Sequence, residues 1–331
     1  MTETRERLLT VENLTTEFFT DRGTVVAVNN VSYHIDSGEI LGLVGESGCG
    51  KSVSQLSLMQ LLRMPPARIA SGKAVFMGVD LFQFKPKSKE MCAIRGRDIS
   101  MIFQEPMTSL NPSMTIGRQM AEVLMTHLNM GKNEALEKCA DMLDQVGIAD
   151  AKKRLKDYPH QFSGGMRQRV MIAMAMLCNP KLIIADEATT ALDATIQAQL
   201  LELLYEMVSK HNIALTMVTH NLGIVARYAN RVNVMYAGRI VESGTTRQVW
   251  ANPLHPYTEG LISCVPKLGE KLEAIKGMPP SLINRPPTCP FLNRCKYRQE
   301  CCFKEPVPPL TEVEDGHATA CLVRLKEAGK I

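Results

Sequence analysis

The sequence predicts an α/β fold, and two observations carry that prediction. The first is an apolar run at residues 40–44, typical of a buried strand, followed by a glycine-rich stretch at 45–52 and a helical pattern at 53–62. The second is the recurrence of short apolar runs at 182–185 and 214–219, with a helical pattern between them. Strands therefore alternate with helices along the chain, and a glycine-rich loop joins one such pair.

The glycine-rich stretch, G-E-S-G-C-G-K-S, fits the pattern G-x-x-x-x-G-K-[ST]. Glycines let backbone N–H groups converge on phosphate oxygens, and the start of the following helix adds a favourable dipole. Lys51 supplies a charge for the β- and γ-phosphates, and Ser52 offers a hydroxyl to Mg²⁺. The alternative, a chance glycine-rich turn, is disfavoured because every fixed position is filled between a strand and a helix. The phosphate-binding residues predicted here are Gly45, Ser47, Gly48, Cys49, Gly50, Lys51 and Ser52.

Alternating apolar and polar residues at 8–19 and 25–35 predict antiparallel strands joined by a turn at 21–23. The other predicted elements are strands at 72–77 and 99–103, helices at 116–147, 162–178 and 194–211, and a hairpin of strands at 232–236 and 239–242.

Composition limits the functional classes. Hydrophobic residues make up 45% of the 331 residues, which suits a sizeable core, and a net charge of +4 is too weak to indicate nucleic-acid binding. No apolar run is long enough to span a membrane, and the first residues contain no apolar signal segment. We therefore expect a cytosolic chain whose ten cysteines are reduced or bound to metal rather than paired in disulfides.

Two more strand ends carry side chains suited to nucleotide chemistry. The run at 182–185 leads into Asp186, which suits a second contact to Mg²⁺, and Glu187, which could orient or deprotonate an attacking water. His220 follows the run at 214–219, at the kind of sheet edge where open α/β sheets bind ligands. The alternatives are a solvated turn for the two carboxylates and a structural role for the histidine.

Residues 162–169, F-S-G-G-M-R-Q-R, resemble the signature motif of ATP-binding-cassette (ABC) ATPases. The motif usually reads L-S-G-G-Q, so Met166 replaces the glutamine, and Ala188 stands where proline usually follows the carboxylates. The resemblance covers about residues 8–250, and Phe18 is placed like the aromatic that stacks on adenine. The cassette's parts occur in the family's order: the phosphate loop at 45–52, Gln104, the signature at 163–167, the strand and carboxylates at 182–187, residues 191–193, and His220.

The resemblance implies a nucleotide-binding domain at residues 1–250, with a RecA-like core, an antiparallel β subdomain and a helical subdomain at about 105–165. It also implies that two cassettes pair head to tail, so that a monomer is a poor ATPase. Glu187, His220 and Gln104 would then be catalytic, and Ser52, Gln104 and Asp186 would hold Mg²⁺. ATP would contact Phe18, the phosphate loop, Gln104 and Asp186 of one cassette and Ser163, Gly164, Gly165 and Met166 of the other.

Prolines are frequent after about residue 250, and this composition predicts a small, irregular, Cys-rich region at 251–331. Residues 252–258, N-P-L-H-P-Y-T, and the cysteine pattern resemble the C-terminal region of oligopeptide/dipeptide permease ATPases. That resemblance implies a second, different ATPase subunit, two membrane-embedded permease subunits and an external peptide-binding protein. The chain would then act at the cytoplasmic face of the membrane.

The clustered cysteines predict a metal site. Four thiolates can hold zinc or an iron–sulfur cluster. Zinc ligands usually form C-x₂₋₄-C pairs, whereas five, six and eighteen residues separate Cys289, Cys295, Cys302 and Cys321 here. The resemblance points to a [4Fe–4S] cluster on these four residues, with Cys301 competing with Cys302 for the third place. Free thiols in a loop-rich tail are the alternative.

The function predicted from the sequence is that of an ATPase subunit that energises import of di- or oligopeptides. Related importers carry nickel or other solutes, so the same role for another solute is one alternative. A soluble ABC ATPase of DNA repair or translation is another, although the long coiled coils or the second cassette typical of those proteins are missing from this sequence. A module that has lost catalysis is disfavoured by the presence of Glu187 and His220.

Overall fold

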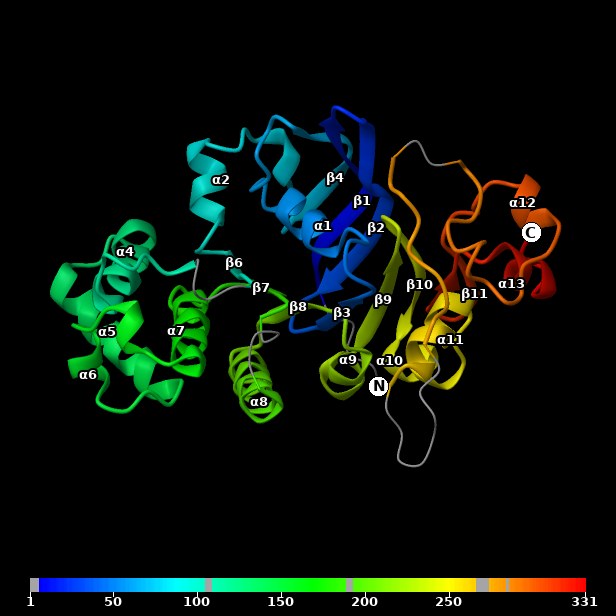
Figure 1. The fold of residues 1–331 in the computed structure, drawn as a ribbon. Coiled ribbons are helices and arrows are strands. Elements are labelled where there is room, and N and C mark those ends of the chain that lie inside the picture. Colours follow the sequence, from blue (N-terminus) through cyan, green and yellow to red (C-terminus); the bar gives the residue numbers. More distant parts are fainter. Residues whose placement is uncertain (1–5, 105–108, 189–192, 266–273, 284–285) are drawn as a thin grey trace. The chain divides into compact units, whose positions relative to one another are not determined.

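The computed structural model describes residues 6–104, 109–188, 193–265, 274–283 and 286–331. Internal contacts divide the chain into two units. The phosphate-loop unit contains residues 7–35, 40–83 and 217–331, and the helical unit contains residues 1–6, 36–39 and 84–216. Figure 1 labels their helices and strands. Each unit is described by itself below.

The phosphate-loop unit holds an antiparallel sheet with the strand order β2-β1-β4-β5. Leu9 of β1 lies opposite Phe76 of β4, and both side chains are buried. The predicted pair of strands at 8–19 and 25–35 is confirmed, and the strand predicted at 72–77 begins five residues earlier. The strands are β1 (Arg7–Thr20), β2 (Gly23–Asp36), β4 (Ala67–Phe76) and β5 (Val79–Asp80), and the short 3₁₀ helix η1 (Leu81–Gln83) follows them.

Five further strands of this unit lie side by side in the order β11-β12-β10-β9-β3. Here β3 pairs in parallel with β9, whereas β9 and β10 form the predicted antiparallel hairpin. The strands are β3 (Ile40–Val44), β9 (Arg231–Tyr236), β10 (Arg239–Thr245), β11 (Thr311–Glu314) and β12 (His317–Thr319). The helices of this unit are α1 (Lys51–Leu58), α9 (Leu222–Tyr228), α10 (Thr246–Ala251), α11 (Pro256–Ser263), α12 (Cys301–Lys304) and α13 (Leu322–Glu327).

The C-terminal region is more regular than its composition predicts. β12 pairs with β10, with Glu242 opposite Thr319, so the tail adds two strands to the sheet. His317 and Thr319 of β12 are fully buried. These strands have only four and three residues, and they form because β10 offers an edge whose N–H and C=O groups require partners.

The helical unit contains two parallel strands, β6 (Ile99–Ile102) and β7 (Leu182–Asp186), with Ile102 opposite Ala185. All five residues of β7 are buried. Its neighbour β8 (Ala214–Thr219) begins in this unit and ends in the other. The helices of this unit are α2 (Lys89–Ile94), α4 (Ile116–Leu128), α5 (Lys132–Gln145), α6 (Ala151–Arg154), η2 (Pro159–Gln161), α7 (Gly164–Met176) and α8 (Ala194–Lys210).

The helical pattern predicted at 116–147 is divided between α4 and α5, which pack against each other and against α7 (Figure 1). The break occurs at Asn129, which has a φ of 52° and ends α4 in the left-handed region. Within the described ranges, no helix is both long and apolar enough to span a membrane.

Candidate nucleotide site and cysteine-lined cavity

The phosphate loop connects β3 to α1, as the sequence predicts. Two of its glycines lie where a side chain has no room. A Cβ on Gly45 would lie 2.1 Å from the carbonyl oxygen of Met235, and one on Gly50 would lie 2.3 Å from that of Ala27. Gly50 also has a φ of 103°, which L-residues rarely adopt. The loop is therefore pressed against neighbouring backbone, and the glycines permit its path.

Lys51 is the best-defined side chain of the loop. Its ammonium group donates hydrogen bonds to the carbonyl oxygens of Gly45 (2.8 Å) and Glu46 (3.0 Å), and the side chain is buried. Ser52 follows as the second residue of α1 and is partly buried. The cation is therefore held directly over the loop whose N–H groups would receive phosphate oxygens.

Glu46 links this loop to the C-terminal region, a connection that the sequence did not reveal. Arg294 binds its carboxylate with two hydrogen bonds, of 2.7 and 2.8 Å. The amide N–H of Glu46 donates to the hydroxyl of Tyr257 at 2.8 Å. Glu46 occupies a variable position of the loop motif, and its partners are more than 200 residues away in the chain. No local pattern could have identified these contacts.

His220 and Phe18 lie in the phosphate-loop unit as well. β3 and β8 are neighbours in the sheet; β3 leads into the phosphate loop, and β8 leads into His220, whose side chain is exposed. Asn221 then caps α9 by accepting the N–H of Gly223. Phe18 lies on β1 and is partly buried, opposite Ala67 of β4. The roles of Phe18 and His220 stay predictions.

The helical unit brings Gln104 and Glu187 together. Because β6 and β7 are parallel, residues that follow them reach the same sheet edge, and Gln104 donates a 2.9 Å hydrogen bond to the Glu187 carboxylate. Glu187 has a φ of 46°, an uncommon backbone conformation for a residue other than glycine. Asp186 ends β7 and is buried. The Gln104 amide therefore holds the carboxylate of a partly buried residue just beyond the end of β7.

The predicted signature residues form the start of α7 in the same unit. Ser163 is the N-cap, and its hydroxyl accepts the N–H of Met166 at 3.3 Å. Ser163 and Gly164 are exposed, and Gly165 and Met166 are partly buried. This exposed helix start suits an anion.

The predicted Mg²⁺ ligands are divided between the units: Ser52 belongs to the phosphate-loop unit, and Gln104 and Asp186 belong to the helical unit. That ligand set stays a prediction. Of the predicted segment 191–193, only Asp193 lies within the described residues, where it caps α8 by accepting the N–H of Ile196.

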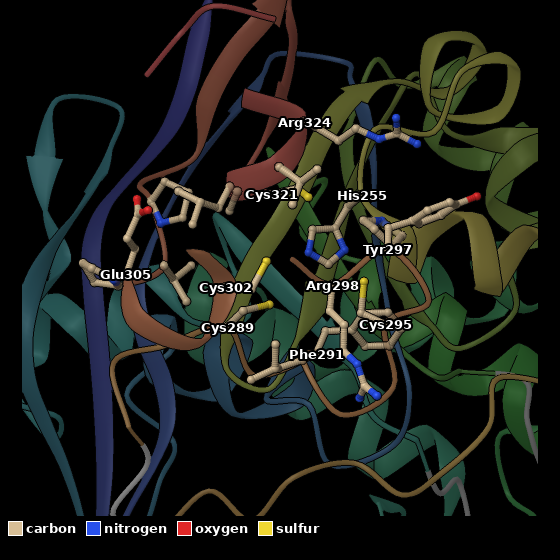
Figure 2. A pocket seen from close by; sticks show the side chains of 18 residues that line it. His255, Cys289, Phe291, Cys295, Tyr297, Arg298, Cys302, Glu305, Cys321 and Arg324 are labelled. Atoms are coloured by element: carbon tan, nitrogen blue, oxygen red, sulfur yellow. The ribbon is translucent and has the colours of Figure 1, made fainter. Parts of the chain in front are cut away.

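The four cysteines predicted to hold a cluster line one cavity in the C-terminal region. Figure 2 shows them around it together with His255. They come from three places: Cys289 and Cys295 from a loop, Cys302 from α12, and Cys321 from the residue before α13. Cys301 is not among the residues that line this cavity.

All ten cysteines lie within the described ranges, and none forms a disulfide. Burial raises the pKa of Cys289 to about 12 and also raises the pKa values of Cys295 and Cys321, so these thiols hold their protons in the absence of a cation. Among the described residues, no group of three or more His, Cys, Asp or Glu side chains is arranged to hold a metal ion.

Comparison with known proteins decides the family. The family described as "ABC transporter" matches residues 28–190, and the family described as "Oligopeptide/dipeptide transporter, C-terminal region" matches residues 241–302. The chain is 48% identical over 326 residues to the dipeptide transport ATP-binding protein DppD of Bacillus subtilis, covering 98% of this chain and 96% of that protein. The chain belongs to the oligopeptide/dipeptide family of ABC transporter ATP-binding proteins.

Other relatives agree with this assignment. The oligopeptide transport ATP-binding protein OppD of Escherichia coli is 49% identical over 325 residues, with 97% of this chain and 95% of that protein covered. Among solved structures, cbiO1 of Clostridium perfringens, part of an ABC transporter complex, has a TM-score of 0.62 at 26% identity, over 75% of this chain and 92% of that one. A dimeric cassette bound to ADP and Pi has a TM-score of 0.64 at 24% identity, over 72% of this chain and 99% of that one, and supports the fold.

Membership confirms several predictions made from the sequence. The fold is an ABC cassette, and this ABC ATPase binds ATP and couples its hydrolysis to transport. Its family also implies membrane-embedded permease partners. The matched C-terminal region contains Glu242, Tyr257 and Arg294, so the link to Glu46 joins the two matched segments of the chain.

Proposed function

We propose that this ABC ATPase energises the import of di- or oligopeptides by hydrolysing ATP at the phosphate loop. The observation that carries the proposal is 48% identity to a dipeptide transport ATP-binding protein over nearly the whole of both chains, including the cysteine-rich end. The residues at 1–250 would form the nucleotide-binding domain, and those at 251–331 would form a transporter-specific C-terminal region.

The chain's own side chains suggest how the reaction proceeds. When ATP binds, Lys51 would exchange its two carbonyl partners for phosphate oxygens, because the carbonyl oxygens and the phosphate oxygens accept hydrogen bonds from the same ammonium group. Glu187, oriented by the Gln104 amide, would accept a proton from the water that attacks the γ-phosphate.

Ser52, Gln104 and Asp186 offer a hydroxyl, an amide and a carboxylate, the oxygen donors that Mg²⁺ prefers. The bound ion would neutralise charge on the phosphates.

The partners would be a second, different ATPase subunit, two permease subunits and an external peptide-binding protein. The exposed start of α7, at Ser163 and Gly164, supports head-to-tail pairing, because an exposed helix N-terminus can reach a nucleotide on another chain. The chain would attach peripherally at the cytoplasmic face, on the two permease subunits. Dilute, monomeric protein should then hydrolyse ATP slowly.

The transport test requires the assembled system. The chain would be co-expressed with a second ATPase subunit, two permease subunits and a peptide-binding protein and reconstituted into vesicles. Peptide accumulation that requires ATP, together with ATPase activity stimulated by the loaded binding protein, is the expected result. Accumulation of nickel or another solute without peptide would favour the alternative importer. Full ATPase activity from the isolated monomer would favour a non-transport ATPase.

We also propose that Cys289, Cys295, Cys302 and Cys321 hold a [4Fe–4S] cluster. Four thiols around one cavity support this, because such a cluster is held by four cysteine thiolates. The bound cluster would cross-link the three segments that carry the cysteines and stabilise the C-terminal region.

Anaerobic purification tests the cluster. The expected protein is brown, with about four iron and four sulfide ions per chain. Colourless protein with stoichiometric zinc would replace the cluster with a structural zinc site, and protein with neither metal would leave free thiols.

A further inference from the structure

The Arg294–Glu46 ion pair joins the C-terminal region to the phosphate loop through two largely buried side chains. The Arg294 side chain is 4% exposed and that of Glu46 is 26% exposed. Nη1 and Nη2 of Arg294 each donate to one carboxylate oxygen, at 2.7 and 2.8 Å. This bidentate geometry fixes the orientation of the carboxylate as well as its position, which a lysine could not do.

Arg294 is itself held rigidly. Its guanidinium lies 5.7 Å from the ring centre of Phe291 and 5.8 Å from that of Tyr236. It also donates to the Tyr236 hydroxyl at 3.2 Å and, through Nε, to the carbonyl of Lys276 at 3.1 Å. The hydrogen bonds that Arg294 donates to the Glu46 carboxylate raise the pKa of Arg294, so the guanidinium stays charged. Little side-chain freedom remains to be lost when Glu46 binds.

Every polar group of Glu46 has a partner in this arrangement. Arg294 binds its carboxylate, Tyr257 accepts its N–H, and its carbonyl accepts the ammonium of Lys51 at 3.0 Å. Tyr257 is fully buried, and its ring packs against those of Tyr236 and Phe291. The position of the carbonyl that holds Lys51 is thus coupled, through one residue, to an aromatic cluster in the C-terminal region.

The charge of Glu46 gives the ion pair a second role. A carboxylate in a phosphate-binding loop repels the phosphates, and the repulsion is strong where burial reduces screening by water. Arg294 cancels that charge. Without Arg294, Glu46 would oppose nucleotide binding and would also be free to compete for Lys51.

We propose that Arg294 is a positioning residue for nucleotide binding: it orients Glu46 in the phosphate loop and neutralises its carboxylate. The C-terminal region would thereby contribute directly to ATP affinity. This inference rests on the proposed nucleotide site at Lys51.

The test measures ATP affinity of the full-length chain by displacement of a fluorescent ATP analogue. Arg294→Gln should weaken binding about tenfold, because the carboxylate is left unpaired. Arg294→Lys should weaken ATP binding about threefold, since lysine keeps the positive charge but cannot make the bidentate contact with the carboxylate. The double variant Glu46→Gln/Arg294→Gln should recover most of the loss, since it removes both charges together. Lys296→Gln, two residues away in an exposed pair with Glu259, is the matched control and should leave affinity unchanged.

A purely structural role would give a different result. In that case the double variant would bind ATP as weakly as Arg294→Gln, and that result would overturn the inference, as would wild-type affinity in Arg294→Gln. In the assembled transporter, Arg294→Gln should raise KM for ATP and leave kcat within about twofold, because the side chains that Arg294 binds among the described residues, Glu46 and Tyr236, are not catalytic. A fall in kcat at constant KM would also overturn it.

Other variants distinguish a failure of this inference from a misfolded variant and from an error in the proposed nucleotide site. If Arg294→Gln does not fold, Arg294→Lys and the double variant carry the test. If Lys51→Ala binds ATP normally, the proposed nucleotide site is wrong; if Lys51→Ala loses binding while the Arg294 variants keep it, only the inference fails.

Discussion

The side-chain amide of Gln104 donates a hydrogen bond of 2.9 Å to the carboxylate of Glu187, across 83 residues of sequence. The contact exists because β6 and β7 are parallel neighbours, so the residues that follow them reach one edge. An amide donor holds a carboxylate in place without neutralising its charge. The pair therefore combines a proton acceptor with a group that orients it.

Glu187→Gln should stop ATP turnover and preserve ATP binding. The amide has nearly the same shape but cannot accept a proton from water, so kcat should fall roughly 100- to 1000-fold while ATP affinity stays near that of the wild type. Single-turnover hydrolysis and equilibrium binding would be compared in the assembled transporter, with the partner ATPase also disabled. Glu206→Gln, an exposed change on α8, serves as the control. Unchanged hydrolysis in Glu187→Gln would mean that another group is the base.

Lys51→Ala should weaken ATP binding roughly 100-fold, about 3 kcal/mol, because the phosphates lose a charge-assisted hydrogen bond from a buried ammonium. Displacement of a fluorescent ATP analogue from the full-length chain measures the loss. Lys85→Ala, at an exposed position outside the loop, should bind as the wild type does. Tight binding by Lys51→Ala would show that the phosphates lie elsewhere.

Cys302→Ser should remove the proposed cluster, whereas Cys301→Ser should keep it. Cys302 is 8% exposed and lines the cavity together with Cys289, Cys295 and Cys321. The adjacent Cys301 is only partly buried and is not among the residues that line the cavity. The visible absorption of anaerobically purified variants, with iron and sulfide analysis, measures the outcome. Loss of colour in Cys301→Ser alone would reverse the assignment.

Glu242→Ala should destabilise the chain by about 3 kcal/mol, since it leaves several buried groups without a partner. The Glu242 carboxylate is fully buried and accepts the N–H groups of Leu254 (2.8 Å) and His255 (2.7 Å), and it lies 2.9 Å from His317 Nε2. Urea unfolding measures the effect. Glu314→Ala, an exposed change on β11, should alter the stability by less than about 0.5 kcal/mol. Equal stability of the two variants would contradict the structural role of Glu242.

Local sequence was sufficient for the elements whose signals lie within a few residues. The strand at 40–44, the loop at 45–52 and the helix after it could be predicted together. The apolar run and the glycine spacing that identify them are each contained within a few consecutive residues. The family signature at 163–167 was equally local. These motifs were enough to predict the fold and the ATPase activity, and residues 252–258 with the cysteine pattern predicted the transporter family.

Tertiary structure decided what joins those elements. The contact between Glu46 and Arg294 spans 248 residues, and neither residue occupies a constrained position of its own motif. The short strands β11 and β12 depend on the open edge of β10, which no local pattern in a proline-rich tail reveals. Tertiary structure also distinguishes two neighbouring cysteines: Cys301 and Cys302 are adjacent in sequence, yet of these two only Cys302 lines the cavity. Such contacts form only when distant segments pack, because their stability comes from burial and paired charges and not from local backbone preference.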